Sequence, residues 1–247
     1  MPQLEGKGAV VTGGSRGIGR AIVERLAADG ATVVFSYASN KTAADEVVAT
    51  VTASGGTAHA VAADFTDPEA PERLMAAAAE LLPGLDILVN NAVMEITPTP
   101  LTEVTDELFD TTFTANARAP FQTLRYAAKN MNDDGRVINI STLNTSRPFP
   151  GLTTYVSGKG ALEQMTNVAA FELGARGITA NVVSPGATDT DLLRDTNPPE
   201  ALEMLNTMTP LGRLGLPSDI ADVVSFLAGP DSRWITGQNI RATGGLM

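Results

Sequence analysis

The sequence contains no cysteine and only one histidine. Without cysteine the chain can form neither a disulfide nor a thiolate nucleophile, and one histidine cannot build a multi-histidine metal site. Positive charge is also scarce, because 17 Lys and Arg stand against 28 Asp and Glu, which gives a formal net charge of -11. Such a charge repels polyanions, so we expect neither nucleic-acid nor anionic-membrane binding. No metal site is predicted.

Long hydrophobic runs are missing as well. No apolar stretch reaches the roughly 20 residues that a membrane-spanning helix needs. The first residues, MPQLEGKGAVVTGG, contain no basic region followed by a long apolar run, so we expect no signal peptide. The sequence therefore predicts a cytoplasmic protein with no membrane partner. Its hydrophobic fraction of 43% over 247 residues is enough for a sizeable core.

Short apolar runs alternate with longer helical patterns along the whole chain. The runs are apolar on both faces, which is typical of parallel strands covered by helices. With no linker or break in composition, the pattern predicts one α/β domain over residues 1–247, a doubly wound parallel sheet (Rossmann-type) with helices on both faces. Strands are expected at 9–12, 32–36, 57–63, 86–90, 136–141, 179–184 and 239–242. Helices are expected at 19–29, 42–54, 69–82, 106–130 with a bend at Pro120, 155–174 and 219–228, with an irregular region before the last of them.

A glycine-rich loop, TGGSRGIG at residues 12–19, lies between the first strand and the first helix. Such a loop lets the backbone approach a pyrophosphate at the helix N-terminus, although a turn without a ligand is the alternative. Where NAD-preferring folds carry an acid, after the second strand, the sequence is SYASNK. Arg16 and Lys41 could instead face a 2′-phosphate, or be ordinary solvated charges. NADP(H) is thus predicted over NAD(H), with hydrogen bonds from Ser36, Ser39 and Asn40.

A tyrosine and a lysine stand four residues apart in TTYVSGKGAL, residues 153–162. In a helix Tyr155 and Lys159 lie on one face. A free phenol has a pKa of about 10, and a fixed ammonium nearby should lower it toward the working range, so that the phenol can serve as a general acid. The alternative is a buried tyrosine beside a surface lysine.

These motifs together resemble one enzyme family. TGGSRGIG, the NNA of Asn90–Ala92, the Tyr155-x-x-x-Lys159 pair and Pro185-Gly186 are similar to those of the short-chain dehydrogenase/reductase family, in the short single-domain branch that includes 3-oxoacyl-carrier-protein reductases. The resemblance extends from about Gly6 to Gly245. It implies a dinucleotide-binding domain, a homotetramer and NADPH-dependent reduction of a ketone or 3-oxoacyl carbonyl to an alcohol by hydride transfer.

The resemblance also implies roles for single residues. Tyr155 would be the general acid, Lys159 its partner and a ligand of the nicotinamide ribose, and Asn116 would hold a water in the proton relay. Thr142 stands where the family has serine; it keeps the hydroxyl that bonds the substrate carbonyl, whereas Ser141 would point to the opposite face. Besides Tyr155 and Lys159, the expected cofactor-binding residues are Gly13, Ser15, Arg16, Gly17, Ile18, Gly19, Ser36, Tyr37, Ala38, Ser39, Asn40, Lys41, Asp64, Phe65, Asn91, Ala92, Pro185, Gly186, Thr188 and Thr190.

Two further positions depart from the family pattern. Val93 replaces the usual glycine of NNAG, and residues 242–245 read ATGG instead of VDGG. The substrate pocket is expected from residues 93–97, 143–151 and 188–211, and it suits a ketone or a 3-oxoacyl group. Its apolar side chains would be Met94, Leu143, Phe149, Leu192, Leu193, Met204 and Met208.

Two other functions remain open. Thr142 and Val93 also fit a catalytically impaired nicotinamide-nucleotide-binding protein of the same fold. The second of these alternatives is a nucleotide-binding transferase on a similar fold, in which the Tyr155–Lys159 pair would have no role. An acidic acyl carrier protein would need a basic patch, for which Arg125, Lys129 and Arg176 are the candidates. With a net charge of -11, a free small carbonyl compound is at least as good a substrate as an acyl thioester.

Overall fold

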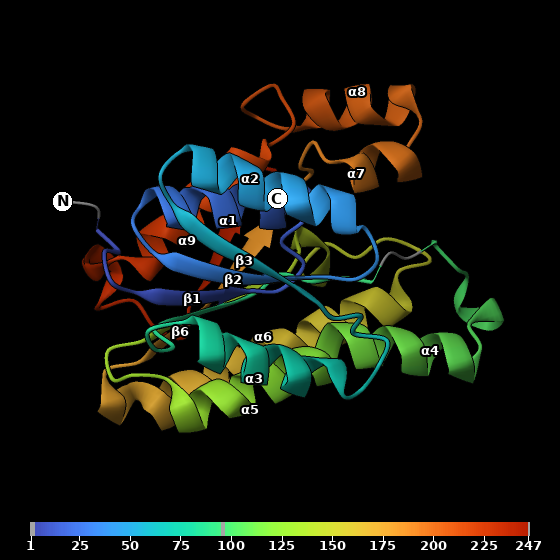
Figure 1. Ribbon diagram of the computed structural model, residues 1–247. Helices are drawn as coiled ribbons and strands as arrows, with labels where there is room; N and C mark the ends of the chain where they lie inside the picture. Colours follow the sequence, from blue (N-terminus) through green and yellow to red (C-terminus); the bar gives the residue numbers. More distant parts are fainter. Residues whose placement is uncertain (1–2, 95–96, 247) are drawn as a thin grey trace.

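The computed structural model describes residues 3–94 and 97–246 of the chain. Within these residues seven strands form one parallel sheet in the order β3-β2-β1-β4-β5-β6-β7 (Figure 1). Each neighbouring pair is parallel. The doubly wound α/β fold expected from the sequence is confirmed. The strands are β1 (Gly8–Val11), β2 (Thr32–Tyr37), β3 (Thr57–Ala62), β4 (Ile87–Asn90), β5 (Arg136–Ile140), β6 (Thr179–Pro185) and β7 (Asn239–Ala242).

Helices cover both faces of the sheet (Figure 1). One face carries α1 (Gly17–Ala28), α2 (Lys41–Ala53) and α9 (Pro217–Ala228), and the other carries α3 (Ala70–Leu81), α5 (Ala119–Asn130) and α6 (Thr153–Leu173). The remaining helices are α4 (Asp106–Phe113), α7 (Asp191–Thr196) and α8 (Pro199–Met208), with short 3₁₀ turns η1 (Leu101–Glu103), η3 (Leu143–Thr145), η4 (Gly174–Arg176) and η5 (Pro230–Ser232).

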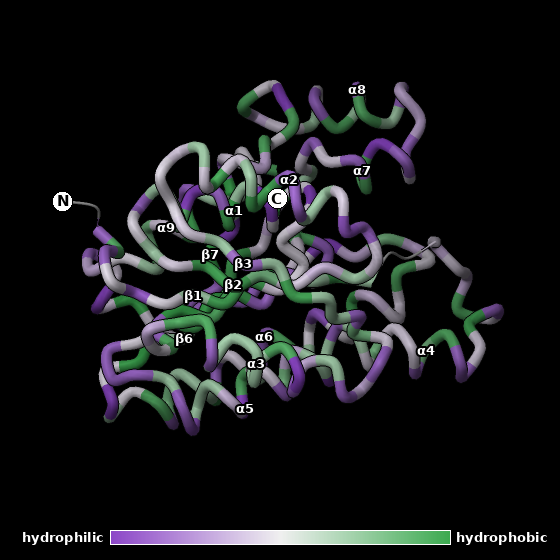
Figure 2. The backbone as a smooth tube through the Cα atoms, in the orientation of Figure 1, coloured by the Kyte–Doolittle hydropathy of each residue, from purple (hydrophilic) through white to green (hydrophobic). Residues whose placement is uncertain are grey.

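The side chains of alternate residues along the central strands pack into two separate apolar layers, one on each face of the sheet. In β1, Ala9 and Val11 pack with the layer under α1, α2 and α9, whereas Val10 packs with the layer over α3, α5 and α6. Figure 2 shows the central strands as mostly hydrophobic along their length. A strand buried on both faces has no polar side, which is why its sequence reads as a continuous apolar run.

A buried polar network fixes α5 and α6 against the centre of the sheet. The Asn90 side chain donates to Asn139 (2.9 Å) across β4 and β5, and Asn139 donates to the Thr166 hydroxyl of α6 (2.7 Å). Thr123 of α5 donates to Asn90 at 2.7 Å. All four residues are buried, and each side chain has a partner, so the network sets the position of both helices at little desolvation cost.

The long helix expected over 106–130 is interrupted, but not at the predicted position. α4 ends at Phe113, a π-helical turn, η2 (Thr114–Arg118), follows, and α5 then begins. Pro120 lies in the first turn of α5, where a proline is tolerated. In a regular helix the amide of residue 120 would bond the carbonyl of Asn116, and proline has no such amide. The wide turn is therefore the way in which the chain accommodates Pro120.

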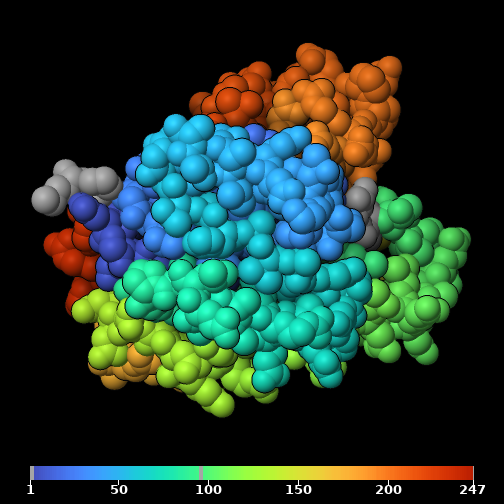
Figure 3. All heavy atoms as spheres, viewed as in Figure 1, coloured from blue at the N-terminus to red at the C-terminus, as the bar shows by residue number. Residues whose placement is uncertain are grey.

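The region expected to be irregular, between β6 and α9, contains two helices. α7 and α8 project from the body of the molecule, as the orange segment at the top of Figure 3 shows. Neither helix has a buried residue. Sequence reasoning missed α7 because six residues are too few to show a helical period, whereas in α8 the apolar residues Ala201, Met204, Leu205 and Met208 do recur at helical spacing. Among the described residues, no helix is long and apolar enough to cross a bilayer.

Candidate active site

The glycine-rich loop packs closely at the N-terminus of α1. The amide of Gly13, at φ +68°, donates to the Ser36 hydroxyl of β2 at 2.9 Å. A Cβ on Gly19 would lie 2.0 Å from the carbonyl oxygen of Gly13, closer than any side chain can come. The loop therefore brings the first turn of α1 directly against the end of β1. The amides at this helix end can bind an anion.

A pocket of about 340 Å³ opens at this helix end. Fourteen of the expected cofactor residues line it, together with Val93, Met94 and Leu192 from the expected substrate side. Asp191, from the expected substrate segment 188–211, also lines it, and sequence reasoning missed Ala63 and Thr66, which follow β3, and Ala115 of η2. The fourteen are Gly13, Ser15, Arg16, Gly17, Ile18, Gly19, Ser36, Tyr37, Ala38, Asp64, Phe65, Asn91, Ala92 and Thr190.

Three residues expected to bind a 2′-phosphate lie outside the pocket lining. Asn40 caps α2, its side-chain oxygen accepting the amide of Ala43 at 3.0 Å. Lys41 is exposed and pairs with Asp45 at 2.7 Å, and this contact raises the pKa of the lysine. Ser39 is not part of the lining either. The described pocket thus has Arg16, not Lys41, as its cationic wall residue.

The loop after β4 is tied to the loop after β1. The Thr12 hydroxyl accepts the amides of Asn91 and Ala92, both at 2.9 Å. The Asn91 side chain donates to the carbonyls of Thr12 and Gly13, both at 3.0 Å. These bonds fix one wall of the pocket. Val93 follows directly and lines the same wall, so its side chain stands where the family pattern has glycine.

Tyr155, Lys159 and Thr142 are brought together at the end of β5. The hydroxyl of Tyr155 is hydrogen-bonded to the side chain of Thr142. One helical turn further, the Lys159 ammonium donates to the carbonyl of Ile140 at 2.8 Å, and the lysine is only 2% exposed. The two side chains of α6 therefore face the same strand end.

The pKa of Tyr155 differs from the expectation. Burial raises it above 10.0, and the bond to Thr142 opposes this only in part. The lowering expected from Lys159 does not outweigh burial, and the ammonium donates to the Ile140 carbonyl at 2.8 Å. Burial also lowers the pKa of Lys159 to about 8, against an attraction to Glu163. At neutral pH Tyr155 is therefore a protonated phenol beside a mostly protonated amine.

Ser141 points away from Tyr155, as its place on a strand predicts. Its hydroxyl donates to Glu163 of α6 at 2.6 Å. Thr142, in contrast, bonds Tyr155 and also accepts the amide of Asn144 at 3.2 Å. Adjacent residues of an extended segment face opposite sides, so Thr142 is the hydroxyl at the tyrosine.

Asn116 lies in the π-helical turn and is fully buried. Its side-chain oxygen accepts the amide of Met94 at 3.1 Å, which joins the turn to the loop after β4. Its side-chain nitrogen has no protein partner although it is buried. A buried amide nitrogen without a partner is a place for a water or a ligand atom. Gly158 makes room for this residue, because a Cβ there would lie 2.9 Å from the Asn116 Cβ.

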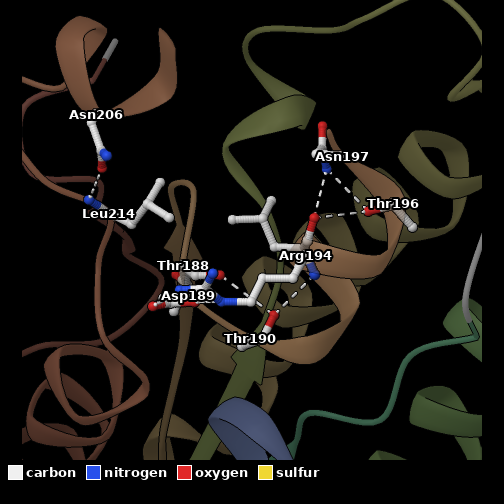
Figure 4. Close-up of polar contacts among 9 residues, drawn as sticks. Thr188, Asp189, Thr190, Arg194, Thr196, Asn197, Asn206 and Leu214 are labelled. Carbon is white, nitrogen blue, oxygen red and sulfur yellow. Dashed lines mark hydrogen bonds and ion pairs between the residues drawn. The ribbon is translucent and has the colours of Figure 1, made fainter. Parts of the chain in front are cut away.

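The segment after β6 contributes Thr190, Asp191 and Leu192 to the pocket lining. Polar contacts join the residues of this segment (Figure 4). Arg194 forms a two-pronged ion pair with Asp189, at 2.6 and 2.8 Å. Thr190 caps α7 by accepting the amide of Leu193 at 3.3 Å. Asn206 of α8 accepts the amide of Leu214 at 2.8 Å. These polar contacts help to hold the shape of this projecting segment, whose two helices have no fully buried residue.

Three of the expected cofactor-binding residues lie at or after the end of β6, outside the pocket lining. Gly186 donates its amide to the Ala242 carbonyl at 3.0 Å, and Thr188 donates its hydroxyl to the Gly186 carbonyl at 3.1 Å. Pro185 is the last residue of β6. Tyr155 and Lys159 are also absent from that lining.

The comparisons with known proteins give the family. The family model described as Enoyl-(Acyl carrier protein) reductase matches residues 13–247. A short-chain dehydrogenase/reductase from Serratia marcescens has a TM-score of 0.93 and 40% identity, over 99% of both chains. A blue fluorescent protein from a metagenomic library in complex with NADPH has 0.93 and 44%, over 99% of both chains. An angucycline C-6 ketoreductase with bound NADP has 0.92 and 43%, over 99% of this chain and 96% of that one.

The chain belongs to the short-chain dehydrogenase/reductase family. The family resemblance and the expected enzyme class, an NAD(P)-dependent oxidoreductase, are therefore confirmed. Within this family member, the described residues contain no group of three or more His, Cys, Asp or Glu arranged to hold a metal ion.

The apolar residues expected around the substrate are distributed unevenly in this short-chain dehydrogenase/reductase. Met94 and Leu192 line the pocket, and Leu143 is buried beside Thr142. Phe149, Met204 and Met208 are exposed. Of the expected segment 93–97, residues 95 and 96 lie outside the described part of the chain. Leu193 is half-buried on α7.

The candidate basic patch lies away from the site. Arg176 follows α6 and binds the carbonyls of Ala128 and Met131, and Asp133 at 2.8 Å, just before β5 begins. Arg125 covers the ring of Phe121 at 5.3 Å. Arg176 thus holds the C-terminal end of α5 near the residue where β5 starts, whereas Thr142 follows the opposite end of β5. They do not surround the catalytic candidates.

Proposed function

We propose that this protein reduces a ketone to an alcohol with NADPH and that Tyr155 is the general acid. The observation that carries the proposal is the hydrogen bond between the Tyr155 hydroxyl and Thr142, with the buried Lys159 one turn away. This arrangement offers a carbonyl oxygen two hydroxyl donors side by side and keeps a cation behind one of them.

The pocket at the N-terminus of α1 fits a dinucleotide. Its glycine loop leaves the backbone exposed to a pyrophosphate, and Gly13 and Gly19 have no space for a side chain. Asp64, after β3, would bond the adenine ring. No acid follows β2 in SYASNK, and Arg16 lines the wall, which favours a 2′-phosphate over a free 2′-hydroxyl. Two relatives at 43 and 44% identity hold NADP and NADPH.

When bound, the nicotinamide cofactor supplies a hydride to the carbonyl carbon. Tyr155 donates its proton to the carbonyl oxygen as negative charge develops there. Its raised pKa keeps this proton in place at neutral pH. Thr142 gives a second hydrogen bond to the same oxygen.

After the transfer, Tyr155 is a phenolate and must regain a proton. Lys159 stabilises the phenolate by charge and hands on a proton. Asn116, whose buried side-chain nitrogen has no protein partner, would hold the water that links Lys159 to solvent. The proline at position 120 leaves the Asn116 carbonyl without its helical donor, so this carbonyl can accept from the same water. Lys159 would also bond the nicotinamide ribose, and Pro185, Gly186, Thr188 and Thr190 would hold the carboxamide end.

The substrate we propose is a free ketone with an apolar body. Met94 and Leu192 give the pocket apolar walls, and the flexible methionines of α8 can adapt to a bulky ligand. Arg176, one of the basic residues that an acidic acyl carrier would contact, lies near the amino end of β5, opposite the end that Thr142 follows. This position argues against an acyl thioester as the substrate. One relative is named a ketoreductase of angucyclines.

We also propose that the protein is a homotetramer in the cytoplasm. Large apolar side chains are exposed on α5 and α6, with Phe121 at 44%, Val168 at 55% and Phe171 at 91%, and Trp234 is 96% exposed after α9. Burial of these side chains between copies would remove them from water. Acrylamide quenching of Trp234, the single tryptophan, tests this. Strong protection that is lost in a Phe171→Asp variant supports assembly, and full accessibility in the wild type contradicts it.

The decisive experiment follows NADPH oxidation by its absorbance with a panel of apolar ketones. Turnover with NADPH, and weaker turnover with NADH, supports the proposal. Tight NADPH binding without turnover on any ketone would favour an impaired nucleotide-binding protein. Binding of neither nicotinamide cofactor would favour the transferase alternative.

A further inference from the structure

Three consecutive residues after the middle of β5 contact three residues along one face of α6. Ile140 accepts the Lys159 ammonium through its carbonyl, at 2.8 Å. Thr142 bonds Tyr155. Between them, Ser141 donates to Glu163 at 2.6 Å. The last of these contacts has no part in the proposed reaction, although it joins the same two elements.

The three helix residues are evenly spaced. Tyr155, Lys159 and Glu163 are each four apart, so they follow one another up a single face of α6. Glu163 is half-buried, and its carboxylate lies one turn beyond the buried ammonium of Lys159. A carboxylate fixed in this place acts on the ammonium through an environment of low polarity, where charge interactions are strong.

Few other ionisable groups face Lys159 from the described elements around it. On its own helix, Tyr155 is the other such group. β6 has no ionisable side chain, β5 presents Ile140 and Ser141, and η3 has none. Arg118 of η2 and the acids of α4 are exposed. Glu163 is the charged group that counters the burial of Lys159. The α4 acids are Asp106, Glu107 and Asp110.

We propose that Glu163 is a positioning residue for the catalytic pair. Through Ser141 it holds the end of β5 against α6, so that the Ile140 carbonyl and the Thr142 hydroxyl stay where Lys159 and Tyr155 meet them. Its charge keeps the buried Lys159 in the ammonium form. The catalytic consequence rests on the proposed function, whereas the effect on Lys159 does not.

The direct test is a titration of Lys159 itself. The chain has four lysines, so protein labelled with ¹³C at the lysine ε-carbon gives few signals, and Lys159→Met identifies the one of interest. The expected wild-type midpoint is about pH 8. In Glu163→Gln, which keeps the shape and an acceptor for Ser141 but loses the charge, we expect the midpoint to fall by about one unit.

Two further variants separate charge from packing. Ser141→Ala keeps the carboxylate but releases it, so the Lys159 midpoint should fall by less than in Glu163→Gln. In the double variant the Lys159 midpoint should fall by the same amount as in Glu163→Gln alone, because the Ser141 hydroxyl acts only by fixing the charged carboxylate. Glu172→Gln removes the same charge from the exposed C-terminal part of α6 and should leave the midpoint unchanged.

Activity provides the second readout. In Glu163→Gln the alkaline limb of the kcat profile with NADPH should move to lower pH together with the Lys159 midpoint, whereas Glu172→Gln should not move it. Lys159 midpoints equal to the wild type in both Glu163→Gln and Ser141→Ala would overturn the proposal, and if only one variant folds, that variant decides. A shifted midpoint in a protein that reduces no ketone would uphold the effect on Lys159 and refute the proposed function instead.

Discussion

The ammonium of Lys159 lies 2.8 Å from the carbonyl oxygen of Ile140, at a position almost closed to solvent. A cation in such a place is costly, and burial accordingly lowers its pKa from 10.5 to about 8. The value is close enough to physiological pH for the charge of this residue to be measurable through the reaction.

The reduction rate should depend on this ionisation. We expect kcat with NADPH to be level below pH 8 and to fall as the pH rises through about 8, because only the ammonium stabilises the phenolate. The free energy of unfolding should rise with pH between about 8 and 10.5, because the buried lysine has lost its proton there while the unfolded lysine still holds it, so the cost of burying the charge disappears. Circular dichroism over this range separates the two effects. A flat profile to pH 10 would contradict the role of Lys159.

Replacement of Tyr155 by Phe removes the proton donor but little of the side-chain volume. Turnover should fall by about 10² to 10⁴, the usual contribution of a general acid. NADPH affinity should change little, because the hydroxyl is directed at Thr142. Steady-state rates and fluorescence titration of NADPH measure the two quantities. Tyr126→Phe, on α5, is the matched control, and wild-type turnover in Tyr155→Phe would refute the assignment of the acid.

Thr142 can be tested by keeping or removing its hydroxyl. Thr142→Ser retains the hydrogen bond to Tyr155 and should turn over at least as fast as the wild type, because the family pattern has serine here. Thr142→Ala should lose about 10² in kcat, as when one donor to a developing oxyanion is removed. Equal rates in the two variants would show that the hydroxyl takes no part. Ser141→Ala distinguishes this effect from that of the neighbouring hydroxyl.

The close approach of Gly19 to Gly13 predicts a defect confined to cofactor binding. In Gly19→Ala the new Cβ would lie 2.0 Å from the Gly13 carbonyl, so the loop must open. We expect NADPH affinity to fall by about tenfold or more, equivalent to about 1.4 kcal/mol. Gly174→Ala, where a Cβ meets nothing within 4 Å and φ is helical, should bind normally. Isothermal titration of both variants with NADPH decides, and unchanged affinity in Gly19→Ala would argue against the proposed pyrophosphate loop.

The central strands of the sheet were predictable because they are buried on both faces, whereas the edge strands β3 and β7 are largely half-buried. β5 is buried at every position, and a run such as RVINI therefore carries its own signal. α7 was missed because six residues are too few to show a helical period, and α8 was missed although its apolar residues recur at helical spacing, because the Thr, Asp and Pro residues around it indicated an irregular region. A bend at Pro120 was expected, whereas the structure has the interruption before it, as a π-helical turn over Thr114–Arg118 whose form depends on how the surrounding helices pack.

The candidate site, too, was predictable from the sequence only in part. Spacing alone brought Tyr155 and Lys159 to one face, and the alternation of a strand separated Thr142 from Ser141. The direction of the Tyr155 pKa could not be read from spacing, because it follows from burial, which the chain creates only when folded. The Glu163–Ser141 contact joins residues 22 apart and has no local signature.

The wide turn at residues 114–118 makes this part of the chain sensitive to length more than to composition. It holds one residue more than a regular helical turn would need, and removal of a single residue would take away the wide turn that accommodates Pro120 and change the phase of α4 relative to α5. Each residue of a helix turns about 100° around its axis. All of α4 would then rotate by that angle against α6, and Asn116 would leave its place beside Gly158. A deletion that removes the wide turn would thereby disrupt the candidate active site, whereas substitutions on the outer surface of the same stretch should leave the site unchanged.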